Sequence, residues 1–228
     1  MTVAGVDGCK GGWIVATLPH EPGPGATLTF SPSIETVIRA TRAGELKTVA
    51  IDMPIGLPTG APRTSDALAR AELGTRRSTF FPTPAFETLA CDDFPSALAA
   101  SRDSIGVGLS KQAFYLLPKV RELRKHLQPS DQPAVFEAHP ELSFQELATR
   151  TLAKKTTAAG IGQRIRTLLP HVPDLVELLA ETPAEAKIDD ALDAFANAWT
   201  ARRAALGQAR TIGDPAFDSE GFELFLRV

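Results

Sequence analysis

Two aspartates stand where folding could bring their carboxylates together. Asp7 directly follows the apolar run Thr2–Val6, and Asp52 directly follows the β-branched run Thr48–Ile51. If these runs are adjacent parallel strands, their carboxyl ends meet at the edge of the sheet where open α/β proteins bind ligands. Two carboxylates there would repel one another, and a divalent cation that prefers oxygen ligands, Mg²⁺ or Mn²⁺, would relieve that repulsion.

A third group of acids lies near the C-terminus, in Ile188-Asp189-Asp190-Ala191-Leu192-Asp193-Ala194. Asp190 and Asp193 are three residues apart, so they share one face of a helix. They lie beside a predicted apolar stripe of Ile188, Leu192, Phe195 and Trp199. We therefore take Asp7, Asp52 and Asp190 as candidate metal ligands, with Asp193 as a further catalytic acid.

Glu137 and His139 follow the predicted strand at 134–138 and could support the same cluster. Each candidate also has a purely structural interpretation. Asp7 before Gly8 could be a turn residue, Asp52 could cap a loop, and Asp189 or Asp190 could cap a helix N-terminus. Glu137 could belong to an ion pair, and His139 before a proline could be an ordinary loop histidine.

Basic residues gather in two stretches. Residues 147–173 contain no Asp or Glu but hold Arg150, Lys154, Lys155, Arg164 and Arg166, and a second run extends from Lys111 to Lys125. These stretches are either solvated helix faces or basic walls for a phosphate-bearing ligand. Lys10, among the glycines 8, 11 and 12, could add to such a surface, although the segment matches no phosphate-loop motif and fits a tight hairpin better.

The pattern of apolar residues predicts the elements that position these side chains. Strands are expected at 2–6, 13–18, 26–30, 48–51, 134–138 and 222–228, and helices at 31–42, 64–73, 110–127 (kinked or interrupted at Pro118), 141–150, 157–169, 173–181 and from either Thr182 or Lys187 to Leu206. Residues 75–95 are expected to form an irregular loop. This order predicts an α/β fold: a mixed sheet of three antiparallel strands and then parallel strands, with helices on both faces. We expect one domain over 1–228 with a mainly helical insertion at about 60–130.

Composition narrows the class of protein. The chain is 43% hydrophobic and 22% charged, as in ordinary globular proteins, and no apolar run approaches the length of a membrane span. Two cysteines are too few for a disulfide framework, which favours a cytoplasmic protein. The net charge of −3 argues against a protein that coats nucleic acid non-specifically.

Several motifs resemble one family, domain-of-unknown-function family 429, whose members are predicted ribonuclease H-like nucleases. The first is Gly5-Val6-Asp7-Gly8-Cys9-Lys10-Gly11-Gly12-Trp13, and the second is Ile51-Asp52-Met53-Pro54-Ile55-Gly56-Leu57-Pro58. Further matches are Ala69-Arg70 with Leu73-Gly74, Phe81-Pro82, Glu137-Ala138-His139-Pro140-Glu141 with Phe144, Lys154-Lys155-Thr156, and Asp189 to Ala194. The resemblance covers nearly the whole chain and implies a ribonuclease H-like fold.

More distantly, the order of the acids is similar to that of RuvC-type Holliday-junction resolvases. Carried over, their acids fall on Asp7, Asp52, Asp190 and Asp193, although the second acid of the resolvases is normally Glu. The resemblance implies two-metal hydrolysis of phosphodiester bonds in DNA or RNA, including structured forms. Asp7 would bridge both Mg²⁺ or Mn²⁺ ions, Asp52 and Asp190 would hold one each, and Asp193 or Glu137 would complete a shell.

The same resemblance implies the substrate contacts and the assembly. Phosphate contacts would come from Lys154, Lys155, Arg76, Arg77 and Lys111, and His139 could touch substrate. Phe80 and Phe81 could stack on bases or simply pack in the core. The resolvases act as dimers, so the resemblance makes a homodimer one option, but the sequence shows no obvious exposed apolar helix and leaves the oligomeric state open.

Two other functions remain open at this point. An actin-like nucleotide-dependent phosphotransferase shares the sheet but needs a second phosphate loop, which the sequence lacks. A non-catalytic nucleic-acid-binding module could keep the scaffold without activity, and it would bind no metal at the acids.

Overall fold

The computed structural model describes all 228 residues, which divide into two compact units. Unit 1 contains Met1–Met53, Pro133–Arg210 and Arg227–Val228, and unit 2 contains Pro54–Gln132 and Thr211–Leu226. The predicted insertion at about 60–130 falls within the first segment of unit 2. The single-domain organisation of the whole chain stays a prediction.

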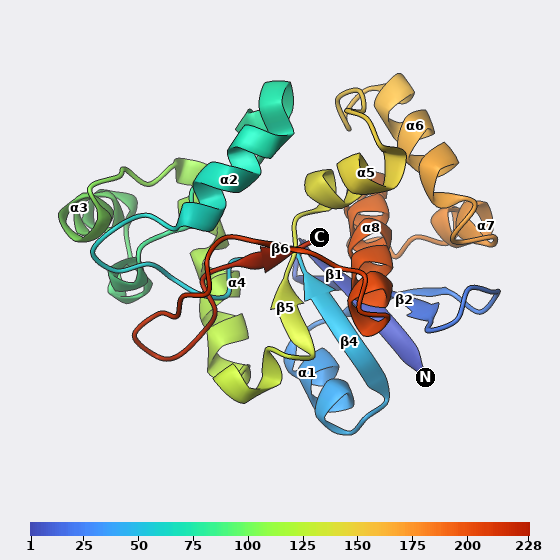
Figure 1. The fold of residues 1–228 in the computed structure, drawn as a ribbon, viewed down its shortest axis with the longest axis horizontal. Helices are drawn as coiled ribbons and strands as arrows, with labels where there is room; N and C mark the ends of the chain where they lie inside the picture. The colour runs from blue at the N-terminus through green and yellow to red at the C-terminus, as the bar shows by residue number, and fades with distance from the viewer. The chain divides into compact units, whose positions relative to one another are not determined.

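Unit 1 is built on a five-stranded mixed sheet (Figure 1). Its strands are β1 (Thr2–Cys9), β2 (Gly12–Pro19), β3 (Thr27–Ser31), β4 (Leu46–Ile51) and β5 (Val135–Glu137), in the order β3-β2-β1-β4-β5. The first three strands pair antiparallel, and β4 and β5 run parallel to β1. This topology confirms the predicted α/β fold with a mixed sheet of three antiparallel strands followed by parallel strands.

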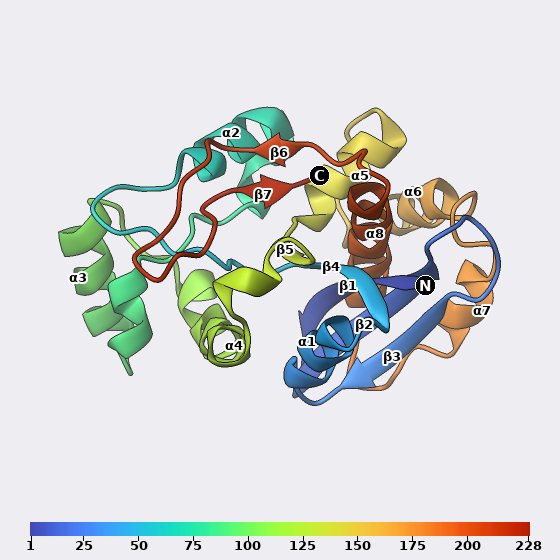
Figure 2. The same ribbon diagram turned by 60° about the horizontal axis from the view of Figure 1, so that its bottom comes forward.

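Helices cover the sheet of unit 1. They are α1 (Glu35–Arg42), α5 (Pro140–Ala148), α6 (Ala158–Leu168), α7 (Leu175–Ala180) and α8 (Ile188–Ala205). Figure 2 shows α1 on one side of β4 and α8 on the other, as predicted for a sheet with helices on both faces. The core between the sheet and α8 is apolar, and its members include Val3, Ile14, Ala50, Phe136 and Phe195.

α8 is the most buried helix of unit 1. Every residue from Ala191 to Ala198 is buried, including the polar Asp193 and Asn197, so α8 is buried on more of its circumference than the predicted apolar stripe requires. Two ends of that stripe differ from the prediction: Ile188 is 40% exposed because it opens the helix, and Trp199 is only partly buried. Trp199 instead packs edge-on against His171 and beneath the Arg203 guanidinium.

Gly5 permits the close approach of β1 and α8. A Cβ atom at Gly5 would lie 2.0 Å from the backbone nitrogen of Ala198 and 2.1 Å from the carbonyl oxygen of Ala194. Any side chain would therefore push the helix off the strand. Strand alternation puts Val3, Gly5 and Asp7 on the same face, so the glycine contact also decides how closely α8 passes Asp7.

The carbonyl oxygen of Val6 joins three elements next to this contact. It accepts a hydrogen bond of 2.9 Å from the Asp52 backbone N–H, which extends the β1–β4 pairing beyond β4. It also accepts a bond of 3.3 Å from Nδ2 of Asn197, which is fully buried on α8. One backbone atom thus fixes β1, the end of β4 and α8 relative to one another.

Unit 2 is mainly helical. It holds α2 (Thr64–Leu73), α3 (Phe94–Ile105) and α4 (Lys111–His126), three 3₁₀ helices at Gly74–Thr79, Phe86–Ala90 and Pro129–Asp131, and β6 (Thr211–Ile212), which pairs with β7 (Leu226–Arg227). The buried carboxylate of Asp218 organises this unit. It accepts hydrogen bonds from Arg124 Nη1 at 2.6 Å and from the backbone N–H groups of Leu57 and Phe222.

Two features of unit 2 differ from the sequence prediction. The stretch 75–95, expected to be irregular, contains two 3₁₀ helices. The sequence analysis also does not predict α3, which Asp93 caps by accepting the Ser96 N–H at 2.8 Å. α4 is not interrupted at Pro118, and a kink at this proline stays a prediction. Across the whole chain, no helix combines the length and the apolar character needed to cross a membrane.

Replacing Gly5 by alanine tests the contact between β1 and α8. We expect Gly5→Ala to lower the free energy of unfolding by about 3 kcal/mol or more, because the added methyl group meets helix backbone that cannot rotate away. Chemical denaturation followed by circular dichroism measures the change. Gly162→Ala in α6 is the control: its Cβ would meet nothing within 4 Å, so stability should stay equal or rise slightly. Equal effects of the two substitutions would contradict the packing described here.

Candidate functional site

Asp7 lies within β1, one residue beyond the last parallel pair with β4 (Val6 with Ile51), on the face covered by α8. It is 8% exposed, and its Oδ1 accepts the N–H of the next residue, Gly8, at 2.7 Å. This local hydrogen bond agrees with the sequence interpretation of Asp7 as a turn residue. Asp52 follows β4 directly, and its backbone is held by Val6 of the adjacent strand.

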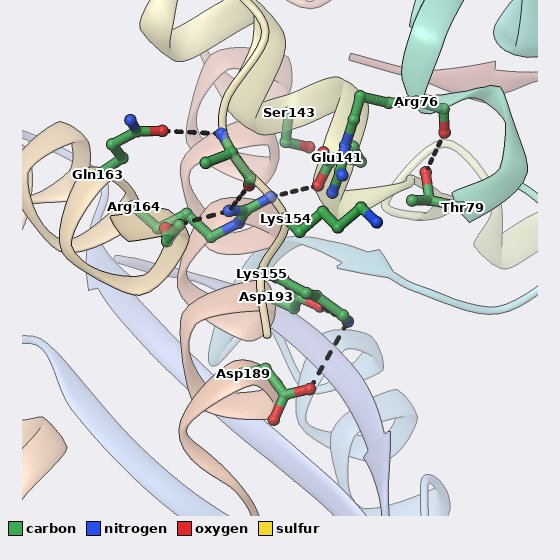
Figure 3. Close-up of polar contacts among 12 residues, drawn as sticks. Arg76, Thr79, Glu141, Ser143, Lys154, Lys155, Gln163, Arg164, Asp189 and Asp193 are labelled. Carbon is green, nitrogen blue, oxygen red and sulfur yellow. Dashed lines mark hydrogen bonds and ion pairs between the residues drawn. The ribbon is translucent and has the colours of Figure 1, made fainter. Parts of the chain in front are cut away.

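Asp193 joins these two aspartates from α8. Its residue is 3% exposed and sits at the turn of the helix that precedes the Gly5 contact. Nζ of Lys155 donates a hydrogen bond of 2.6 Å to Asp193 Oδ2 and lies 4.0 Å from Oδ2 of Asp189, as Figure 3 shows. One ammonium group therefore faces two acids of α8.

The electrostatics show that Asp7, Asp52 and Asp193 form one cluster. Burial raises the pKa of Asp7 well above its usual value, and the charges of Asp52 and then Asp193 raise it further. Burial raises the pKa of Asp52 to about 7, against the opposing charge of Lys155. For Asp193, burial raises the pKa to about 6, again against Lys155. The three buried carboxylates thus carry more negative charge than their surroundings compensate.

Lys155 responds in the opposite sense. Burial lowers its pKa, but the charge and hydrogen bond of Asp193, and then the charges of Asp7 and Asp52, outweigh burial and raise the pKa above the usual lysine value. Lys155 is therefore a permanent cation of the cluster at any ordinary pH.

Asp190 takes a different position from Asp193. Its Oδ2 accepts the Lys187 backbone N–H at 2.9 Å, so it caps the start of α8, as one of the sequence interpretations proposed. Burial raises the pKa of Asp190, partly offset by that hydrogen bond. Its charge acts on Asp7 less than those of Asp52 and Asp193 do. Among the predicted acids, Asp52 and Asp193 are therefore the ones whose charges act most strongly on Asp7.

Glu137 borders the cluster from β5. Its residue is 5% exposed, and its charge contributes to the raised pKa of Asp52. It pairs in register with Ile51, so strand alternation places it on the sheet face opposite Ala50 and Phe136. His139 occupies the N-cap position of α5, where its carbonyl oxygen accepts the N–H groups of Leu142 and Ser143.

The loop that carries Lys154 and Lys155 is held from several sides. The carbonyl oxygen of Lys154 accepts bonds from the backbone N–H and the hydroxyl of Thr157, at 3.0 and 2.8 Å. Gly160 lets α6 pass directly over this carbonyl, because a Cβ there would lie 1.9 Å from it. Gln163 Oε1 accepts the Ala153 N–H at 2.7 Å.

Arg164 completes the support of this loop, so its role differs from the predicted solvent-facing or phosphate-facing one. It is fully buried and donates to the carbonyl oxygens of Ala153 and Gly160. Nη2 of Arg164 also pairs with Glu141 Oε2 at 2.6 Å (Figure 3), and the guanidinium packs on the Phe144 ring. Glu141 and Phe144 belong to the motifs matched in the sequence, which gave them no role. In the structure, both contact the Arg164 guanidinium.

The other predicted contact residues, Lys10, Arg76, Arg77 and Lys111, belong to different parts of the chain. Lys10 is exposed in the turn between β1 and β2. Arg76, Arg77 and Lys111 belong to unit 2, where Lys111 opens α4 with its Nζ 5.9 Å from the centre of the Phe94 ring. Phe80 is 4% exposed and packs in the core, whereas Phe81 is 37% exposed.

The donor set of the cluster suits a hard divalent cation, although the side chains as they lie do not surround one. No group of three or more His, Cys, Asp or Glu side chains among the 228 residues is arranged to hold a metal ion. The acids nevertheless supply only carboxylate oxygens, the ligands that Mg²⁺ and Mn²⁺ prefer. Burial first, and then the charges of neighbouring acids, raise the pKa values of these carboxylates, and a bound cation would oppose both effects.

The raised pKa values predict a pH-dependent stability. A carboxyl group whose pKa is higher in the folded state binds more protons there than in the unfolded chain, so stability falls as pH rises from about 4 to about 7. In chelator, Asp52→Asn should therefore raise the unfolding temperature at pH 8 by about 2 to 4 °C, from on the order of 1 kcal/mol. The gain should shrink toward pH 5, as thermal melts at both pH values will show.

Asp214→Asn, in an exposed position of unit 2, is the control and should change neither melt. A gain of the same size at pH 5 and pH 8 would show that the carboxylate charge of Asp52 is not what destabilises the metal-free protein.

Comparison with known proteins places these residues in a family. No curated protein matches the chain. Among solved structures, the Thermus thermophilus RuvC structure aligns with 91% of this chain and 98% of its own, at 12% sequence identity and a TM-score of 0.35. A family model described as protein of unknown function (DUF429) matches residues 5–217, which include Gly5, Asp7, Asp52, Lys155 and Asp193. The chain belongs to this DUF429 family.

Proposed function

We propose that this protein is a divalent-metal-dependent phosphodiester hydrolase that acts on nucleic acid. The observation that carries the proposal is the convergence of three buried carboxylates, Asp7, Asp52 and Asp193, at the end of two parallel strands. Their pKa values are raised by burial and by mutual repulsion. A purely structural cluster would be more stable with neutral residues, so the charge is better explained by a cation-binding role.

Mg²⁺ or Mn²⁺ would be held by Asp7 and Asp52, whose positions the sheet fixes. When bound, such a cation polarises a phosphoryl oxygen and lowers the pKa of a bound water. The contribution of the chain is to orient the acids. The Gly8 N–H fixes the rotation of the Asp7 carboxylate, and the bond from Asp52 N–H to Val6 fixes the backbone that carries the second acid.

The lysines of the 153–157 loop support a phosphate-bearing substrate. Lys154 and Lys155 are consecutive and lie on a loop that Thr157, Gln163 and Arg164 hold in place. Positive charge beside a carboxylate cluster can bind the phosphate oxygens that the acids alone would repel. DNA or RNA, structured or single-stranded, fits this chemistry. Homodimer formation and a cytoplasmic location stay predictions.

No specific observation favours an actin-like phosphotransferase or a non-catalytic binding module. The β1–β2 turn, with Gly11 at φ 77°, is a tight hairpin turn and does not precede a helix, unlike the phosphate loop of nucleotide-binding folds. A binding module without activity does not need three buried, repelling acids. A phosphodiesterase therefore accounts for more of the site than either alternative.

Nuclease assays with Mn²⁺ or Mg²⁺ on a panel of single-stranded, duplex and branched DNA and RNA test this proposal. We expect metal-dependent cleavage by the wild type and a loss of about 100-fold or more in Asp7→Asn, because the variant loses a charged group at the reacting centre. Asp214→Asn should cleave at the wild-type rate. Cleavage that persists in chelator, or that is equal in Asp7→Asn, would rule out this site as its source.

A further inference from the structure

Lys155 is a cationic member of the carboxylate cluster. Its Nζ lies 2.6 Å from Asp193 Oδ2 and 4.0 Å from Asp189 Oδ2 (Figure 3). The same ammonium acts electrostatically on Asp7 and Asp52. Four carboxylates therefore share one positive charge that belongs to the chain.

The position of this ammonium is built into the fold. The loop around Lys155 is fixed at the carbonyls of Ala153 and Lys154, which accept bonds from Arg164 and Thr157. Gly160 permits α6 to pack against the Lys154 carbonyl. These contacts hold the backbone on both sides of Lys155 in place. The ion pair with Asp193 therefore differs from that of a mobile surface lysine.

The ammonium group of Lys155 limits how many divalent ions the cluster can take. Its Nζ donates to Asp193 Oδ2 at 2.6 Å, so it occupies the position beside Asp193 that a second divalent ion would need. Two positive charges that close together in a buried site repel one another strongly. The acids left to hold a divalent ion are Asp7 and Asp52, on which the charges of Asp190 and Glu137 also act.

We propose that Lys155 fills one of the two cation positions of a two-metal site, so that the chain binds a single divalent ion between Asp7 and Asp52. Asp193 stays paired with Lys155. This inference rests on the proposed function and specifies the cation content of the same site. It departs from the two-ion arrangement that the resemblance to the resolvases implies.

A phosphodiester bound at such a site meets two cations of different kinds. One is an exchangeable divalent ion, and the other is an ammonium that the loop delivers at a fixed position. The Lys155 side chain is 39% exposed, so its charge can reach a substrate while it holds Asp193, which is 4% exposed at its side chain.

Titration calorimetry with Mn²⁺ alone, at neutral pH and without substrate, tests the stoichiometry. We expect one ion per wild-type chain and two per Lys155→Met chain, because loss of the ammonium frees Asp193 as a ligand. Electron paramagnetic resonance provides a second measurement: a mononuclear Mn²⁺ spectrum in the wild type and a coupled pair in the variant. Lys154→Met, which removes the neighbouring lysine of the same loop, should bind one ion.

Lys155→Arg keeps the positive charge and should also bind one ion, which preserves the test if Lys155→Met does not fold by circular dichroism. Two ions in the wild type or in Lys155→Arg, or one ion in a folded Lys155→Met, would overturn the inference and leave the proposed hydrolase standing. A wild type that binds no Mn²⁺ at all would overturn the metal-dependent function itself.

Discussion

The close contact between Gly5 on β1 and the backbone of α8 determines the site of this protein. Without a side chain at Gly5, α8 can lie within van der Waals distance of the strand, and Asp193 then faces the acids that end β1 and β4. The Val6 carbonyl fixes the same three elements through its bonds from Asp52 and Asn197. Apolar packing of the α8 core holds this arrangement even though the acids repel one another.

A second interaction that supports the site is the buried ion pair of Arg164 and Glu141. A buried ion pair is weak evidence of stability, because desolvation offsets most of its attraction. Its value here is geometric, since Arg164 also holds two carbonyls of the loop that delivers Lys155. Arg164 further lowers the pKa of Asp193, after Lys155. The guanidinium therefore supports the cluster both through the loop and through its charge.

Much of this arrangement could be predicted from the sequence, because it follows from local patterns. Asp7 and Asp52 follow apolar runs whose lengths and β-branched residues indicate parallel strands, and the sheet places them as expected. The choice between Asp190 and Asp193 could not be made in this way. Three-residue spacing puts both on one helix face, and only the start of α8 at Ile188 makes Asp190 a cap.

The roles of Arg164, Asn197 and Gly5 were beyond sequence patterns for a different reason. Each acts through contacts that are distant in sequence, such as the bond from Asn197 to Val6, 191 residues away. A buried arginine also looks like a surface arginine in any local window, so Arg164 was grouped with the basic residues that surround it. Arg164 lies one helical turn after Gly160, which packs on the Lys154 carbonyl. The sequence does not reveal this contact, because it forms only when the loop folds against α6.

The charge of the cluster has a consequence for the order of binding. Even with Lys155 and Arg164 near the cluster, burial and the charges of neighbouring acids keep the pKa values of Asp7, Asp52 and Asp193 above their usual value. On the proposed function, a phosphodiester would add another negative charge, and in a partly buried site that repulsion is poorly screened. A divalent ion bound first would remove this repulsion, and a bound phosphate would in turn favour binding of the ion. The affinities for cation and substrate would then be coupled, and by reciprocity each would raise the other by the same factor.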